Sequence, residues 1–118
     1  MMTVRRPRRG DVYWVDFCPP RGTEQAGTRP ALVVQNDVGN AAAPYTVVVA
    51  ITTTLFRKAY PFLVPLTAGE GGLPRASVVN CAHVLTIDQS RLQGRLGQLD
   101  AARMAEVGEA LRYQLALD

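Results

Sequence analysis

One polar segment of the chain holds residue types that can bind and process a phosphate group. Residues 21–30 read RGTEQAGTRP and carry Glu24, Gln25 and Arg29 between two apolar stretches. A guanidinium can hold two phosphate oxygens at once, and a carboxylate can accept a proton. Pro30 restricts Arg29 to an extended backbone, which limits the directions open to its side chain. The alternative is a solvated connector with a weak surface pair between arginine and glutamate.

Hydroxyl and cationic side chains follow the run with the strongest β-propensity. That run, TVVVAITTT, ends in Thr52, Thr53 and Thr54, and Arg57 and Lys58 come shortly after it. A threonine hydroxyl at a strand end can donate a hydrogen bond to a ligand, and the two cations can contact a backbone phosphate. The alternatives are ordinary β-branched strand formers and an exposed turn.

Two further side chains could contact a substrate. Phe17 lies beside the polar segment and is the best candidate for stacking on a base, whereas Trp14 on the same stretch is more typical of a core residue. His83 is the only histidine, and it could contact substrate or donate a proton. The alternative for His83 is a hydrogen-bonded structural role within a strand.

Several familiar kinds of site are missing from the sequence. A lone histidine excludes a site built on a histidine pair, and Cys18 and Cys81 lack the spacing of metal ligands. The sequence has neither a glycine-rich phosphate loop nor a Gly-x-Ser-x-Gly elbow. We therefore expect a protein that uses no metal and no cofactor.

The sequence offers no candidate for membrane insertion or export. Its longest apolar runs fall well short of the roughly 20 residues that a membrane-spanning helix needs. The N-terminus is basic, but Asp11 and Asp16 interrupt the apolar segment that a signal peptide would require. We expect a cytoplasmic protein with reduced cysteines and no membrane partner.

Length and composition predict one globular domain with a basic start. The chain has 118 residues, of which 47% are hydrophobic and 19% charged, and this fits a single domain over residues 1–118. The net charge is only +3, but four arginines crowd residues 1–9. This stretch is either a contact for a polyanionic partner or a solvated basic tail.

Runs of β-branched and aromatic residues, bounded by turn formers, predict about five short strands. Pro65 lacks a backbone donor, so its strand is expected at an edge. A short helical turn is expected within DQSRL. The strands are expected at residues 11–17, 31–35, 46–54, 62–66 and 76–87.

The C-terminal stretch predicts one amphipathic helix. Met104, Val107, Leu111 and Leu115 recur every three or four residues, and Asp100 is suited to cap the N-terminus. Short strands followed by one helix suggest a small, partly closed antiparallel barrel with the helix packed against it.

Four stretches of the chain, taken in order, resemble the MazF/PemK family of toxin endoribonucleases. They are RRGDVYWVDF (8–17), GTEQAGTRPALVVQND (22–37), VVAIT (48–52) and TIDQSRL (86–92), and an amphipathic C-terminal helix follows them. The Glu-Gln-x-Gly-x-Arg-Pro core followed by Ala-Ile-Thr is specific, and the resemblance covers nearly the whole chain.

The resemblance implies a fold, an activity and partners. The fold is mainly β with a C-terminal helix, a half-open SH3-like antiparallel barrel of the MazF/PemK/CcdB toxin type. The activity is metal-independent, sequence-specific cleavage of single-stranded RNA such as mRNA. It proceeds by 2′-hydroxyl attack, leaves 2′,3′-cyclic phosphate and 5′-hydroxyl ends, and inhibits translation and growth. The partners are a MazE-like antitoxin that covers the RNA groove and a second copy in a homodimer.

The resemblance also implies roles for individual residues. The family's Arg-Pro arginine falls on Arg29 and its Ala-Ile-Thr threonine on Thr52, which implies that both are catalytic. Because arginine stays protonated, it is a poor proton acceptor, so Glu24 is the alternative catalytic candidate for the general base and His83 ranks a distant third. The expected substrate contacts are Phe17, Gln25, Thr53, Arg57, Lys58 and His83.

One stretch departs from the family pattern. Many members have Glu-Gln-(Ile/Val)-Arg before the Thr-Ile-Asp motif, where this chain has Ala82-His83-Val84-Leu85. An amide and an arginine are thereby replaced, which bears on the base preference and on the shape of the groove.

Two other functions compete with RNA cleavage. CcdB-type toxins share the barrel and bind DNA gyrase without catalysis. The pairing of Arg29 with Thr52 argues against that function, because binding alone would not need both residues. A regulatory barrel that retains RNA uncut is the third possibility.

Overall fold

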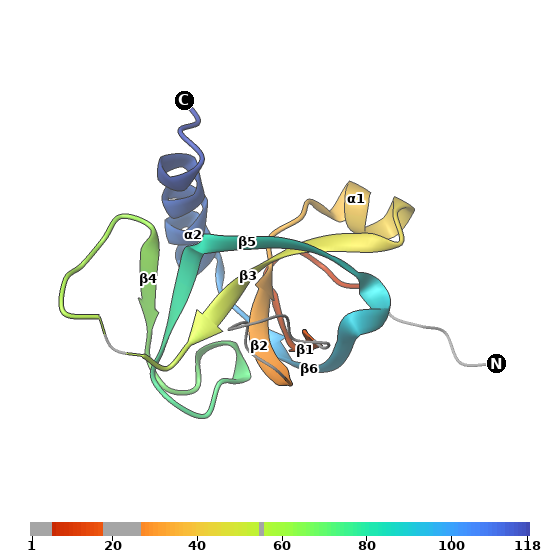
Figure 1. Cartoon of the computed structure of the whole chain (residues 1–118), viewed down its shortest axis with the longest axis horizontal. Helices are drawn as coiled ribbons and strands as arrows, with labels where there is room; N and C mark the ends of the chain where they lie inside the picture. The colour runs from red at the N-terminus through yellow and green to blue at the C-terminus, as the bar shows by residue number, and fades with distance from the viewer. Residues whose placement is uncertain (1–5, 18–26, 55) are drawn as a thin grey trace.

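The described part of the chain forms one antiparallel sheet with a helix at its C-terminal end. The computed structural model describes residues 6–17, 27–54 and 56–118. Within them, six strands pair in the order β4-β5-β3-β2-β1-β6 (Figure 1). The strands are β1 (Asp11–Asp16), β2 (Thr28–Val33), β3 (Tyr45–Thr52), β4 (Leu63–Leu66), β5 (Ser77–Asp88) and β6 (Leu92–Gln98). The helices are α1 (Asp37–Ala42) and α2 (Ala101–Gln114), and the 3₁₀ turns are η1 (Glu70–Gly72) and η2 (Gln89–Arg91).

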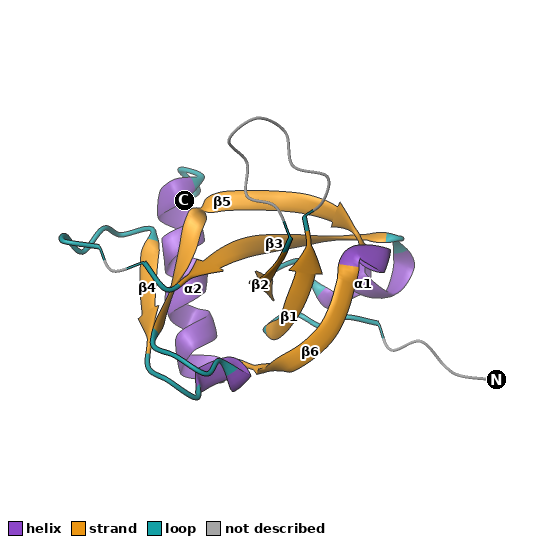
Figure 2. Cartoon of the chain, turned by 60° about the horizontal axis from the view of Figure 1, so that its bottom comes forward, coloured by secondary structure: helices purple, strands orange, loops and turns teal. Residues whose placement is uncertain are grey.

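The sheet curls because η2 carries the chain from β5 across to the far edge. Asp88 at the end of β5 pairs with Tyr45 of β3, whereas Leu92 at the start of β6 pairs with Val15 of β1 (Figure 2). The two outermost strands, β4 and β6, remain unpaired with each other, so the barrel stays half open. The expected fold class is confirmed, and so is the edge position of the strand that contains Pro65.

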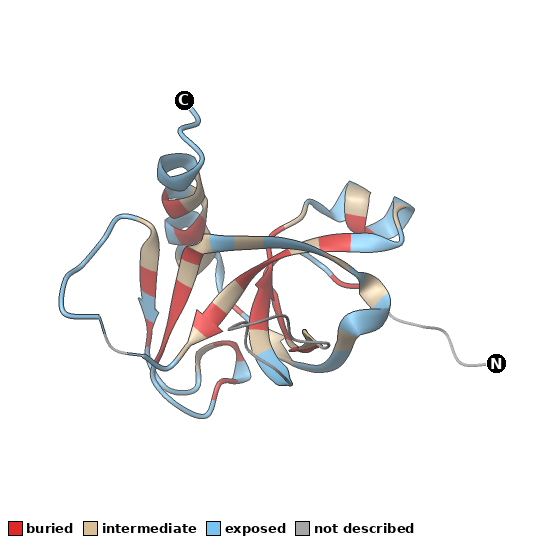
Figure 3. Cartoon of the chain, viewed as in Figure 1, coloured by how far each residue is buried: buried red, intermediate tan, exposed pale blue. Residues whose placement is uncertain are grey.

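Apolar side chains pack on both faces of the sheet, in two clusters. The larger cluster lies between the sheet and α2 and includes the fully buried residues Val12, Leu32 and Val49. The smaller cluster lies on the opposite face and includes Val15 and Val48. Val48 and Val49 belong to different clusters because successive side chains of a strand point to opposite faces. Adjacent residues of the central strands are therefore buried, and Figure 3 shows buried residues in red on β2 and β3.

The helix α2 begins as its sequence predicts. The carboxylate of Asp100 accepts a hydrogen bond of 2.8 Å from the backbone N–H three residues later and so caps the first turn. Val107 is fully buried, and Met104 and Leu111 pack beside it. Leu115 lies beyond the last helical residue and is 51% exposed, so the prediction that it continues the apolar face is wrong. No helix of the described residues has the length and apolar character needed to cross a membrane.

Two elements, β6 and α1, form where the sequence predicts neither. The sequence of β6, LQGRLGQ, has weak β-propensity, and the strand forms because β1 supplies its hydrogen-bonding partner. In α1 the side chain of Asn36 accepts a hydrogen bond from the Gly39 N–H at 2.8 Å. The buried Asn40 accepts another from the Thr46 hydroxyl at 2.7 Å. The turn expected at Asn36 is therefore the N-terminal cap of a short helix.

The turn η1 packs directly on β6, and only glycine fits this contact. Gly72 has a φ of +75°, and a Cβ there would lie 2.0 Å from the carbonyl oxygen of Leu96. Across the same contact, a Cβ on Gly97 would lie 2.7 Å from the backbone of Gly71. The missing side chains let two backbone segments approach closely and hold the β4–β5 connection against β6.

The same turn is tied to α2 by a two-point ion pair. Arg103 donates from Nε to Oε1 of Glu70 at 2.8 Å and from Nη2 to Oε2 at 3.2 Å. The backbone N–H and the hydroxyl of Thr67 donate to Oε2 at 2.7 and 3.0 Å. The hydrogen bonds from Arg103 and then Thr67 lower the pKa of Glu70 to about 2.

We expect Glu70→Gln to lower the melting temperature at neutral pH and to lower it by a smaller amount at acid pH. The pKa of Glu70 is about 2 in the folded chain and 4.5 ordinarily, so its charge stabilises the fold fully above pH 4.5. That stabilisation is lost as the pH falls toward about 2. Melting curves of both proteins across this range measure the effect.

Glu109→Gln is the matched control for this prediction. Glu109 is 81% exposed and its ion pair with Arg112 spans 3.8 Å, so its removal should change little at any pH. A difference between Glu70→Gln and the native chain that stays constant from neutral to acid pH would contradict the assigned role.

Candidate functional site

Arg29 and Thr52 lie on neighbouring strands and on the same face of the sheet. The paired positions of β2 and β3 reach Ala31 and Ala50, and Arg29 and Thr52 each lie two residues further along. Since alternate residues of a strand share a face, Arg29 projects on the side of Ala31, and Thr52 projects on the side of Val48. That is the face of the smaller cluster. The structure therefore brings the two residues together.

The backbone of Arg29 is held in the sheet while its side chain is exposed. Arg29 pairs with Val15 of β1, which is fully buried, and Pro30 pairs with Trp14. An exposed guanidinium on a fixed strand can bind an anion with little cost for ordering the backbone.

The hydroxyl of Thr52 is oriented by the turn that ends β3. Its Oγ1 accepts a hydrogen bond from the Thr54 N–H and donates one to the Thr54 hydroxyl, each at 3.1 Å. A ligand oxygen could replace the Thr54 hydroxyl as acceptor while the backbone N–H continues to hold Oγ1 in place. Thr53 is exposed in the same turn.

His83 lies in a bulge of β5, the strand that neighbours β3. The β3–β5 register jumps from Val49 opposite Val84 to Ala50 opposite Asn80, so residues 81–83 bulge out of the ladder. The side chain of Asn80 accepts a hydrogen bond from the N–H two residues later at 3.0 Å. The bulge begins just after Asn80, which pairs with Ala50 of β3. Ala50 lies two residues, or about 7 Å, from Thr52 along β3. His83 is exposed there.

The sequence analysis expects a strand at this position but not the bulge. Asn80 is the one local signal, because an asparagine side chain can hydrogen-bond to nearby backbone and interrupt a ladder. Arg29, Thr52 and the bulge thus come from three adjacent strands, β2, β3 and β5.

The other predicted contacts have varied positions. Phe17 follows β1, packs partly against the smaller cluster, and donates its backbone N–H to the Gly27 carbonyl at 3.3 Å. Arg57 and Lys58 are exposed in the connection between β3 and β4. Glu24 and Gln25 lie outside the described residues. Across the described residues, no group of three or more His, Cys, Asp or Glu side chains is placed to hold a metal ion.

Two cavities among the described residues lie away from Arg29 and Thr52. One cavity of about 430 Å³ lies between the N-terminal segment and α1, and one of about 580 Å³ lies between α2 and β4. Neither is lined by Arg29 or Thr52. Because the side chain of Arg29 is exposed on a strand, an extended chain lying on the sheet could reach it.

Comparison with known proteins decides the family. Residues 8–115 match the family described as PemK-like, MazF-like toxin of type II toxin–antitoxin system. The chain belongs to this family. The resemblance noted in the sequence is therefore confirmed over nearly its whole length.

Known members of the PemK/MazF family are similar in sequence over almost their entire length. Endoribonuclease EndoA of Bacillus subtilis is 43% identical over 93% of this chain and 95% of its own. Endoribonuclease MazF of Staphylococcus epidermidis is 38% identical over 94% of this chain and 92% of its own. These relatives confirm the expected enzyme class, endoribonuclease, at the level of the family.

Solved structures of family members share the fold. MazF from Deinococcus radiodurans has a TM-score of 0.78 at 32% identity and covers 96% of this chain and 99% of its own. A mycobacterial endoribonuclease in complex with its cognate antitoxin has a TM-score of 0.79 at 29% identity and covers 95% of this chain and 97% of its own.

Proposed function

We propose that this member of the PemK/MazF family cuts single-stranded RNA, mRNA in particular, at a short sequence and without a metal ion. The observation that carries the proposal is the placement of Arg29 and Thr52 on adjacent strands and one face. The names of EndoA and MazF as endoribonucleases support the same activity here. Cutting mRNA in the cytoplasm would stop translation and growth.

The reaction needs no nucleophile from the protein, because RNA carries its own. The 2′-oxygen attacks the phosphorus, the bond between phosphorus and the 5′-oxygen breaks, and a 2′,3′-cyclic phosphate and a 5′-hydroxyl result. A base takes the proton of the 2′-hydroxyl, and the leaving 5′-oxygen gains a proton. The protein must align the 2′-oxygen with the phosphorus and stabilise charge on the phosphate oxygens.

Arg29 and Thr52 meet the second of these needs. The guanidinium of Arg29 can hold two phosphate oxygens, and its charge favours the more negative transition state. The Thr52 hydroxyl can donate to the same phosphate from β3, with its oxygen held by the Thr54 N–H at 3.1 Å. Two donors on adjacent strands would fix the phosphate before the reaction begins.

We propose Glu24 as the general base and keep His83 as the competing candidate. A carboxylate in the segment beside Arg29 is chemically suited to take a proton. The position of His83 in the β5 bulge, close to the level of Thr52, supports the alternative.

Further side chains would hold the RNA on either side of the cut. Phe17, which precedes the polar segment 21–30 in the chain, can stack on a base, and Gln25 can hydrogen-bond to a base edge. Thr53 adjoins Thr52, and Arg57 and Lys58 can contact backbone phosphates from the connection that follows β3.

We also propose that an antitoxin and a second copy of the chain bind this toxin. Solved relatives include a mycobacterial endoribonuclease in complex with its cognate antitoxin and a MazE–MazF assembly from Deinococcus radiodurans. An antitoxin segment lying over Arg29 and Thr52 would block the approach of RNA.

A long RNA incubated with the purified chain in EDTA tests the proposed function directly. We expect discrete cuts with 5′-hydroxyl ends, and mapping these ends gives the cleaved sequence. An RNA with a single 2′-deoxy sugar at the cut should remain intact there, because it lacks the nucleophile. Cleavage of that substrate at the same position would contradict the mechanism, and retention of RNA without cuts would contradict the activity.

Arg29→Ala should abolish most cleavage and leave the fold intact. Loss of one charged donor to the transition state typically costs about 100-fold or more in rate. The side chain is exposed, so the melting temperature should stay unchanged. Arg75→Ala is the matched control, because it removes an exposed arginine from the β4–β5 connection. Near-native cleavage by folded Arg29→Ala would refute the assignment.

Glu24→Gln and His83→Gln separate the two candidates for the base. Each variant keeps the approximate size of the side chain and removes its ability to take a proton. We expect Glu24→Gln to lower the rate at saturating RNA by about 100-fold or more and His83→Gln to change it by less than tenfold. The reverse order would assign the base to His83.

A further inference from the structure

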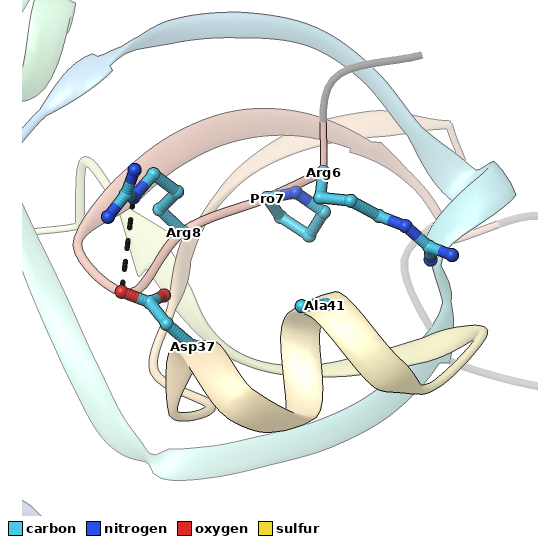
Figure 4. A pocket seen from close by; sticks show the side chains of 5 residues that line it. All are labelled: Arg6, Pro7, Arg8, Asp37 and Ala41. Atoms are coloured by element: carbon cyan, nitrogen blue, oxygen red, sulfur yellow. Dashed lines mark ion pairs between the residues drawn. The ribbon is translucent and has the colours of Figure 1, made fainter. Parts of the chain in front are cut away.

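A basic pocket beside α1 has no role in the proposed cleavage. Arg6, Pro7 and Arg8 line this cavity of about 430 Å³, and Asp37 and Ala41 of α1 face them (Figure 4). The pocket combines two guanidinium groups with one carboxylate, so its charge is positive overall.

The segment that carries these arginines is anchored to the fold. Pro7 is buried. The backbone N–H of Arg8 donates to Asp11 at 2.9 Å, and the backbone N–H of Arg9 donates to Asp37 at 2.7 Å. The arginine side chains therefore project from a held backbone rather than from a free tail.

The hydrogen-bond acceptors that Arg6 contacts among the described residues are neutral groups. Its Nη1 donates to the carbonyl oxygen of Ala43 at 3.1 Å and to Oε1 of Gln89 at 2.8 Å. These bonds orient the guanidinium but do not neutralise it. The remaining N–H groups of the fork stay available for a ligand.

The carboxylate of Asp37 compensates the charge of Arg8 only in part. Its Nε lies 3.9 Å from Oδ2 of Asp37, and its side chain is 66% exposed. The hydrogen bond from the Arg9 N–H lowers the pKa of Asp37, which therefore stays ionised and offsets part of the charge of Arg8. The charge of Arg6 is thus less compensated by neighbouring groups than the charge of Arg8.

The pocket connects over η2 to the strands that carry the candidate site. Gln89, the partner of Arg6, and Arg91 belong to the same turn. Nη1 of Arg91 donates to the carbonyl oxygen of Asp16 at 3.4 Å, at the end of β1. Asp16 pairs with the start of β2, one residue before Arg29. A chain lying across Arg29 can therefore continue over η2 toward Arg6.

We propose that Arg6, with Arg8 as a second contact, binds phosphodiester groups of the RNA outside the cleaved sequence. This inference rests on the proposed function. Figure 4 shows the two side chains directed toward opposite ends of the pocket, with Pro7 between them. Separated charges suit successive phosphates of one strand better than a single small anion. The contact strengthens binding of long RNA and leaves the cut sequence unchanged.

The test compares a double variant, Arg6→Gln with Arg8→Gln, and the native chain on two substrates. One is a long RNA, and the other is a short oligonucleotide limited to the mapped cut sequence. We expect kcat/KM on the long RNA to fall by up to about fivefold for each arginine. The short substrate should be cut as before. The slope of log kcat/KM against log salt should become shallower by about 1.4, or 0.7 for each lost phosphate contact.

Three further variants test the effects of net charge, of charge type and of the carboxylate of Asp37. Arg75→Gln with Arg112→Gln removes the same charge elsewhere and should leave the salt slope unchanged. Arg6→Lys with Arg8→Lys should keep most of the slope, because it keeps the charge. Asp37→Asn frees Arg8 and should act in the opposite direction, with tighter binding of long RNA. Melting curves establish that each variant is folded.

Several results would overturn the inference. An equal loss with the Arg75 and Arg112 pair would mean that only net charge matters. An equal loss on the short oligonucleotide would place the arginines in the cleavage groove. Weaker antitoxin binding with unchanged action on RNA would mean that the pocket binds an acidic protein segment. Binding of long RNA by Arg29→Ala protein, with and without Arg6 and Arg8, tests the pocket even if the native chain does not cleave.

Discussion

The position of the candidate site depends on the register of β3 between β2 and β5. Val48 and Val49 are adjacent and fully buried, yet they pack into different clusters on opposite faces. A slip by one residue would exchange the two faces along the whole strand and lose well-packed valines, each worth about 1.5–3 kcal/mol of burial. The same register sets Arg29 level with Thr52 on one face. Packing in the core therefore positions the exposed Arg29 and the half-buried Thr52.

The strand β5 must pair with β4 at one end and follow the curl toward β6 at the other. The bulge at residues 81–83 separates these two halves, and it lies next to the candidate site. Cys81 within it is fully buried, and burial raises the pKa of its thiol to about 11, so this cysteine stays protonated and unreactive. The bulge both shapes the sheet and places His83 at the surface. The close approach of Gly72 to Leu96 then holds the β4–β5 connection against β6.

The N-terminal arginines show how tertiary contacts change the meaning of a charged stretch. In the sequence they fit a solvated tail and a polyanion contact equally. In the fold, Arg6 is oriented by Ala43 and Gln89, which are distant in the chain, whereas Arg8 faces Asp37. Only the spatial arrangement separates a cation with neutral partners from one that is partly compensated. The shared face of Arg29 and Thr52 likewise becomes apparent only when the strands are assembled.

Local patterns were sufficient for the main strands and for the cap of α2 at Asp100, because each depends on residue types at short spacing. Arg29 and Thr52 were selected only by the resemblance of their motifs to those of the family. Contacts between distant segments decided the rest. The weak strand β6 forms against β1, the side chain of Asn40 accepts a hydrogen bond from Thr46, and the bulge arises where the pairing of β5 with β4 ends. Leu115 fits the helical period, but the helix ends before it, so it remains exposed. Such features depend on which backbone groups find partners across the fold, and periodicity along the chain carries no information about that.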